Sequence, residues 1–148
     1  MLKRWIGLGL VIMALAASPV GRAFAELQTR GAVSMRVHYV EIVCRNVEEQ
    51  CAALAAVHGV AFGAPTADLG LARVAEAADG LLIGVRAPLA EHETPIVRTY
   101  YEVADIAQAV AEAEAAGAVI AYPPTRQGDT GTWAIYFLGD IQIGLWQR

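Results

Sequence analysis

Hydrophobic and polar positions follow the same order twice along the chain. Residues 36–44 are rich in β-branched and aromatic types and predict a strand. Asn46 then opens a helical run to Val57, with Asn46 itself as the expected N-cap. Two more strand-like runs, 71–76 and 81–87, are joined through an Asp-Gly pair that is typical of a hairpin turn. The first half of the chain therefore predicts a strand, a helix and a pair of strands.

The second half repeats this plan, and Asp105 lies 59 residues after Asn46. The prediction is a strand at 96–103, Asp105 as N-cap, and a helix at 106–116. Strands are then expected at 118–122, 132–138 and 141–147, with the first two separated by a loop at 123–131. The repeat therefore predicts two tandem modules, 35–88 and 95–148, which are joined by the polar linker 88–95. Each module can cover one sheet face with its own helix, which leaves the other faces to form a cleft in an α+β fold.

The N-terminal residues predict a signal peptide. The apolar run 5–17 follows Lys3 and Arg4 and precedes Ala23-Phe24-Ala25, a small-residue cleavage pattern after residue 25. Its thirteen residues are fewer than the roughly 20 that a membrane-spanning helix needs. We therefore expect an exported protein, periplasmic or secreted, with a short N-terminal segment at 26–34 and one domain at 35–148. A cytoplasmic location is the alternative if translation starts at Met35, which directly precedes the first strand.

Charge narrows the function classes. Three of the eleven Lys and Arg residues lie in the first 25 positions, so eight remain against fifteen Asp and Glu. A nucleic acid or an anionic membrane needs a basic surface, so neither is an expected partner. Lys3 is the only lysine, which excludes lysine-based covalent catalysis from the processed chain.

Several segments resemble the vicinal oxygen chelate superfamily of glyoxalases, bleomycin-resistance proteins and extradiol dioxygenases. Residues 39–42 (Tyr-Val-Glu-Ile) with Asn46-Val47 resemble its opening, and residues 101–106 resemble the start of its second module. Residues 131–136 and 143–147 resemble its last two strands, so the likeness runs from about 35 to 147. The resemblance implies tandem βαβββ modules that form a cupped mixed β-sheet with helices packed on its outer face. It also implies a divalent metal near the middle.

The positions at which the superfamily holds its metal carry unsuitable residues here. The resemblance places a first His ligand seven residues before the helix cap, which is Tyr39, while strand alternation turns the adjacent His38 toward the helix. The equivalent position of the second module is Arg98, and that of the last strand is Gly144. A guanidinium offers no lone pair and repels a cation. We therefore expect no metal and no other cofactor, and a metal-dependent lyase, isomerase or dioxygenase with non-standard ligands is the alternative.

Strand alternation also predicts what lines the cup. An arginine can bind a carboxylate bidentately, and Tyr or Trp can stack on a planar molecule. We expect the cup to bind a small organic molecule, anionic or aromatic, with Glu41 as the one candidate for a general base. The alternative is that Arg98 pairs with Glu41 or Glu102 in a purely structural network. The candidate ligand-binding residues are Tyr39, Glu41, Arg86, Arg98, Tyr100, Glu102, Gln142 and Trp146.

Other features leave alternatives open. Cys44 and Cys51 face one strand–helix seam and form either a disulfide or two buried thiols. The Glu-His-Glu triplet at 91–93 is interpreted as a solvated charged turn, since adjacent side chains in a linker point apart. The loop 125–132 is expected to be a flap over the cleft, with Arg126 reaching in. Open sheet edges also permit a homodimer.

Overall fold

A computed structural model describes residues 35–148. The predicted signal peptide (1–25) and the segment 26–34 lie outside the described residues. The two predicted modules are present, and each has the order βαβββ. The first contains β1 (Val37–Val43), α3 (Val47–His58), β2 (Pro65–Thr66), a 3₁₀ helix (Ala67–Leu69), β3 (Ala72–Glu76) and β4 (Leu82–Arg86). The second contains β5 (Ile96–Glu102), α4 (Ile106–Ala115), β6 (Val119–Gln127), β7 (Gly131–Leu138) and β8 (Ile141–Gln147).

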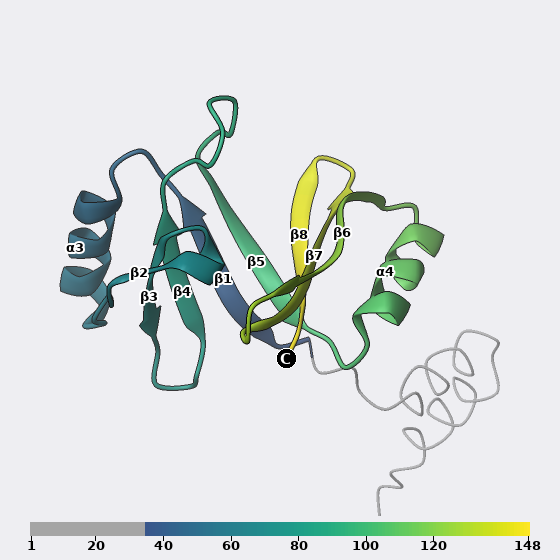
Figure 1. Cartoon of the computed structure of the whole chain (residues 1–148), viewed down its shortest axis with the longest axis horizontal. Helices are drawn as coiled ribbons and strands as arrows, with labels where there is room; N and C mark the ends of the chain where they lie inside the picture. The colour runs from purple at the N-terminus through teal and green to yellow at the C-terminus, as the bar shows by residue number, and fades with distance from the viewer. Residues whose placement is uncertain (1–34) are drawn as a thin grey trace, which may run out of the picture. The chain divides into compact units, whose positions relative to one another are not determined.

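All eight strands form one mixed sheet in the order β2-β3-β4-β1-β5-β8-β7-β6. The modules meet where β1 and β5 pair antiparallel, while β1–β4 and β5–β8 are parallel pairs. The helices lie on the outer side at opposite ends of the sheet (Figure 1). There α3 contacts β4 and α4 contacts β6, β7 and β8. Within residues 35–148, neither α-helix covers the inner face of the cupped sheet, and the α+β class is confirmed.

Both helices begin where the sequence predicts. The Asn46 side chain accepts a hydrogen bond from the backbone N–H of Glu49, and Asp105 accepts one from Gln108. Gly59 ends α3 with φ +68°, a conformation that favours glycine. No helix among residues 35–148 is long and apolar enough to cross a membrane.

The sequence prediction was wrong for the region 118–131. β6 runs through Pro123 and Pro124 to Gln127, so only a short turn remains where a nine-residue loop was expected. β6 is the edge strand and pairs only with β7, so its prolines need not donate to a second neighbour. A register shift between Tyr122 and Thr125 spans both prolines. The prediction also missed β2 and the 3₁₀ helix, which are too short to show a periodic pattern.

Candidate functional site

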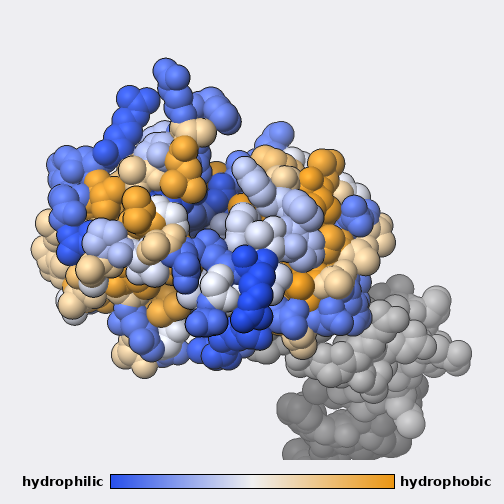
Figure 2. All heavy atoms as spheres, in the orientation of Figure 1, coloured by the Kyte–Doolittle hydropathy of each residue, from blue (hydrophilic) through white to orange (hydrophobic). Residues whose placement is uncertain are grey.

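The inner face of the sheet encloses a cavity of about 490 Å³. In Figure 2 the surface is hollowed between the two modules, and the hydrophilic β4–β5 loop projects above the hollow. A volume of this size is usual for sites that bind small molecules. The cavity brings together all the sequence-predicted candidates except Glu102, namely Tyr39, Glu41, Arg86, Arg98, Tyr100, Gln142 and Trp146.

Strand register explains why these side chains meet. In the central β1–β5 pair, Tyr39 lies opposite Tyr100 and Glu41 lies opposite Arg98. Glu41 is also level with Gly84 of β4, two residues before Arg86. Alternate residues of a strand share a face, so all these side chains point toward the cavity.

A buried ionic network centred on Glu41 forms the polar part of the site. One Glu41 oxygen accepts a hydrogen bond from Nε of Arg86 at 2.6 Å. The other oxygen is paired with Nη1 of Arg98 and also accepts the Tyr100 hydroxyl at 3.1 Å. Glu41, Arg86 and Arg98 are each less than a tenth exposed. The alternative considered from the sequence, an Arg98–Glu41 ion pair, is therefore present.

Two neutral or acidic partners complete the network. Gln142 accepts a hydrogen bond from Nε of Arg98 at 3.0 Å with its side-chain oxygen. Glu93, from the β4–β5 loop, accepts two bonds from the Arg86 guanidinium, at 2.8 and 2.7 Å. Two guanidinium groups thus face two carboxylates, so the buried network carries no net charge.

The electrostatic surroundings keep Arg86, Glu93 and the two cavity tyrosines in their ordinary charge states. Burial opposes the charged form of Arg86, but hydrogen bonds to Glu93 and the charge of Glu41 outweigh it and raise the pKa of Arg86. Hydrogen bonds from Arg86 lower the pKa of Glu93 to about 2. Burial raises the pKa of the Tyr39 and Tyr100 hydroxyls. At neutral pH both tyrosines are therefore neutral and Glu93 is an anion.

Aromatic residues form the rest of the wall. Tyr39, Tyr100, Ile135 and Trp146 make one buried cluster, in which the ring centres of Tyr100 and Trp146 are 5.7 Å apart. Trp133 continues this wall outward, and its ring centre is 5.6 Å from that of Tyr122 on the edge strand. The cavity can therefore hold an apolar, planar body beside a polar network.

Glycines make room for the two cavity tyrosines. An added Cβ at Gly84 would lie 1.9 Å from the Tyr39 hydroxyl, and one at Gly144 would lie 2.2 Å from the Tyr100 ring. Both distances are far below van der Waals contact. The bare backbone at these two positions therefore sets how deeply the rings sit in the sheet.

The structure corrects three residues of the sequence prediction. Glu102 lies at the end of β5 and pairs with Arg148 and Arg36 outside the cavity, because its backbone N–H is bonded to Arg36 at the rim of the sheet. Hydrogen bonding to Arg148 lowers the pKa of Glu102. Arg126 is exposed and bonds to the Gly128 carbonyl in the β6–β7 turn, so it does not reach the cavity.

His38 is the third correction. A register shift between Val37 and Tyr39 interrupts strand alternation, so His38 does not turn toward the helix. Its ring centre lies 5.4 Å from that of Trp146. Burial lowers the pKa of His38, and it does not line the cavity.

Sequence reasoning missed several cavity residues. Glu93 was assigned to a solvated turn, yet it folds back onto Arg86, and His92 beside it also lines the cavity. Trp133 lies in β7, and Tyr122 lies in β6, whose end was predicted too early. An acidic residue in a polar linker gave no signal for an inward turn, whereas the alternation in β7 could have identified Trp133.

The residues at the expected metal position do not fit a divalent ion. Residues 35–148 contain no group of three or more His, Cys, Asp and Glu side chains that could hold a metal. Both oxygens of Glu41, the central carboxylate, already face guanidinium groups. A cation placed there would meet the positive charges of Arg86 and Arg98.

The two cysteines are separate thiols in the structure. Cys51 is buried on α3, and Cys44 at the end of β1 is half-buried. Burial raises the pKa of both thiols, so neither resembles an activated nucleophile.

The chain matches no protein-family model and no curated protein in sequence comparisons. Solved structures do match. Methylmalonyl-CoA epimerase from Mycobacterium tuberculosis is similar, with a TM-score of 0.61 and 17% identity, over 79% of this chain and 91% of that one. A hypothetical protein from Bacillus halodurans C-125 has a TM-score of 0.62 and 11% identity, over 76% and 94% of the two chains.

A third match is a Streptomyces coelicolor methylmalonyl-CoA epimerase variant in complex with 2-nitronate-propionyl-CoA. Its TM-score is 0.55 at 15% identity, over 77% of this chain and 97% of that one. Methylmalonyl-CoA epimerase is a vicinal oxygen chelate protein, so these likenesses confirm the fold that the sequence resemblance implied. Likeness at this level of identity establishes a shared fold alone, because one fold can carry many functions.

Proposed function

We propose that this chain is a binding protein of the vicinal oxygen chelate fold that takes up a small aromatic or planar organic molecule without a metal. The single observation that supports the proposal most strongly is the composition of the cavity. An aromatic wall of Trp133, Tyr122 and Tyr100 faces a neutral ionic network built on Glu41. A largely apolar pocket with a few convergent polar groups is the usual form of a small-molecule site.

The network favours binding over metal-dependent chemistry. A lyase, isomerase or dioxygenase of this fold would need a cation where Arg98 and Glu41 are paired. Glu41 is also poorly placed to act as a general base, because both of its oxygens already accept hydrogen bonds, from two guanidinium groups and a tyrosine hydroxyl. These contacts favour positioning a ligand rather than abstracting a proton.

A ligand screen tests the proposal. Aromatic and planar metabolites are added to the purified protein and the melting temperature is recorded. A ligand at 100 times its dissociation constant stabilises the folded state by roughly 2.7 kcal/mol, which raises the melting temperature by several degrees. If none of a broad aromatic set raises it, the proposal is wrong.

The variant Tyr122→Ala locates the binding site. Tyr122 is 57% exposed, so its removal leaves the core intact. Loss of one stacking contact is expected to weaken binding about three- to tenfold in calorimetric titration. Val119→Ala is the matched control, because Val119 is an exposed apolar residue of the same strand that does not line the cavity. Equal affinities of the two variants contradict a ligand on this wall.

We also propose that the protein is exported through residues 1–25. The basic residues, apolar run and small-residue site of that segment occur in the order of a signal peptide, which supports the proposal. N-terminal sequencing of the protein expressed in its own host is expected to begin at Glu26. A sequence that begins at Met1 or Met35 contradicts export by this route.

A further inference from the structure

Two carboxylates bind Arg86, and they come from different kinds of structure. Glu41 belongs to β1, at the centre of the sheet. Glu93 belongs to the β4–β5 loop and binds the outer edge of the guanidinium with both oxygens, at 2.8 and 2.7 Å. This parallel, two-oxygen arrangement is the one that arginine forms with a free carboxylate.

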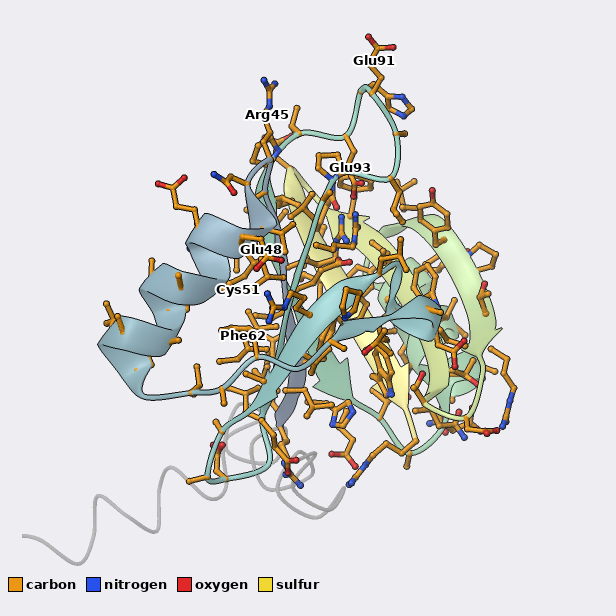
Figure 3. The ribbon with its side chains drawn as sticks, turned by 60° about the vertical axis from the view of Figure 1, so that its left-hand side comes forward. Arg45, Glu48, Cys51, Phe62, Glu91 and Glu93 are labelled. Atoms are coloured by element: carbon orange, nitrogen blue, oxygen red, sulfur yellow. The ribbon has the colours of Figure 1, made fainter. Side chains whose placement is uncertain are left out.

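Glu93 holds the loop against the cavity. It also accepts a hydrogen bond from the backbone N–H of Leu89 at 2.7 Å, and Leu89 lines the cavity. Figure 3 shows Glu91 at the tip of the loop pointing away from the body of the protein and Glu93 turned back toward it. Other partners in the network, Glu41, Tyr100 and Gln142, stand on paired strands. Glu93 is therefore the partner that can leave without breaking the sheet.

Charge balance decides where an anionic ligand can bind. The network is neutral, so an anion added at Arg98 in place of the neutral Gln142 amide would leave an uncompensated buried negative charge. An anion that replaces Glu93 on Arg86 exchanges one carboxylate for another. Glu93 then moves with its loop into water, and the buried network stays neutral.

From these contacts we infer that Arg86 is the carboxylate-recognition point of the cavity and that Glu93 occupies it in the absence of ligand. The inference rests on the proposed function of the cavity and narrows the ligand to a monocarboxylate with an aromatic or planar apolar body. The carboxylate binds Arg86, the apolar body lies in the aromatic-walled cavity, and the β4–β5 loop is released on binding.

Matched pairs of ligands test the inference. Benzoate and benzamide, 2-naphthoate and 2-naphthamide, and indole-3-acetate and indole-3-acetamide differ only in a carboxylate or a neutral amide. Calorimetry on the wild-type protein is expected to detect binding of the carboxylates. Glu93→Gln removes the competing charge while keeping the side-chain shape, so carboxylates should bind about tenfold more tightly to this variant. Amides should change less than about twofold.

The control variant is Glu91→Gln, which changes the same charge on the same loop but at a side chain that points away. It is expected to leave the affinities of both ligand classes as in the wild type. An equal gain in Glu91→Gln and Glu93→Gln would mean that general charge repulsion, rather than occupation of Arg86, limits carboxylate binding, and would overturn the inference.

Hydrogen exchange of the wild-type protein gives a second, independent readout. A bound carboxylate is expected to increase exchange in residues 88–94, because the loop loses its attachment, whereas the matching amide is expected to leave exchange there unchanged. Binding of carboxylates without faster exchange overturns the inference. Binding of amides but not carboxylates also overturns it and leaves the proposed function standing, whereas failure of both classes contradicts the proposed function itself.

Discussion

Glu41 is the residue on which the ionic network of the cavity is centred. In the centre of the cavity its carboxylate has Arg86 on one oxygen and Arg98 on the other. Burial of these three charges is tolerated because each is paired and hydrogen-bonded. The same pairing leaves neither oxygen free for a metal. The residue that the sequence offers as a possible base is thus the centre of the buried ionic network.

Removal of the Glu41 charge should be costly. Glu41→Gln leaves Arg98 facing only neutral groups in a buried site, and we expect the free energy of unfolding to fall by about 3–5 kcal/mol in urea denaturation. Glu102→Gln is the control, because Glu102 pairs at the rim of the sheet with Arg148, whose side chain is 57% exposed, and it should cost less than about 1 kcal/mol. Similar losses in both variants would mean that the buried network contributes no more than a surface pair.

Glu93 should make stability depend on pH in the acid range. Its pKa is about 2 in the folded chain, against 4.5 for an unperturbed carboxyl. The unfolded chain therefore takes up the proton first, so the stabilisation by Glu93 is fully present above about pH 4.5 and is lost as the pH falls toward 2. Urea denaturation across this range should show a shallower pH dependence for Glu93→Gln than for Glu91→Gln. Identical slopes would contradict the assignment of the Arg86–Glu93 pair.

At the scale of elements, strand pairing places an aromatic ring against the backbone of a glycine in the neighbouring strand. Tyr100 of β5 and Gly144 of β8 are level in a parallel pair, and the tyrosine ring lies over the bare glycine backbone. The equivalent strands of the first module place the Tyr39 hydroxyl over Gly84. Each module therefore uses a glycine in its last strand to seat an aromatic ring on the inner face.

Gly144→Ala tests this packing. Its Cβ would lie 2.2 Å from the Tyr100 ring, so the ring must move out of a buried cluster, and we expect a loss of about 1–3 kcal/mol of unfolding free energy. Gly63→Ala is the control, because the nearest atom to its Cβ would be at an ordinary 3.6 Å. Thermal denaturation measures this difference. Equal melting temperatures for Gly144→Ala and Gly63→Ala would contradict the packing of the Tyr100 ring against Gly144.

At the scale of the whole molecule, two similar modules build one site from different residues. Glu41 and Tyr100 occupy equivalent positions in β1 and β5, 59 residues apart, and so do Tyr39 and Arg98. Here the side chains differ between the halves, which gives an ionic network on one part of the cup and an aromatic wall on another.

Removal of divalent ions should therefore leave the protein unchanged. Dialysis against EDTA is expected to alter neither the melting temperature nor the affinity for a ligand found in the screen, because the network supplies its own charge balance. Elemental analysis of protein purified without a metal-binding tag completes the test. A stoichiometric metal whose removal abolishes binding would contradict the proposal.

Much of the arrangement could be predicted because it depends on local pattern. Asn46 and Asp105 begin helices wherever their side chains can cap them, and alternation in β1 and β5 assigned Tyr39, Glu41, Arg98 and Tyr100 to one face. The orientation of His38 was predicted wrongly because a register shift breaks the alternation in β1. The end of β6 was predicted wrongly because an edge strand tolerates prolines. Both errors arise from strand pairing, which is β5 beside His38 and β7 beside β6.

The sequence by itself determined the two-module plan, the positions of both helices and the residue types available to the cup, because caps and periodicity act within a few residues along the chain. Only the tertiary structure decided which charges meet. Glu93 lies 52 positions from Glu41, and no local pattern indicates that both bind Arg86. Ion pairs between strands and loops depend on the register of the folded sheet and on the path of the loop, and neither is encoded in short-range order.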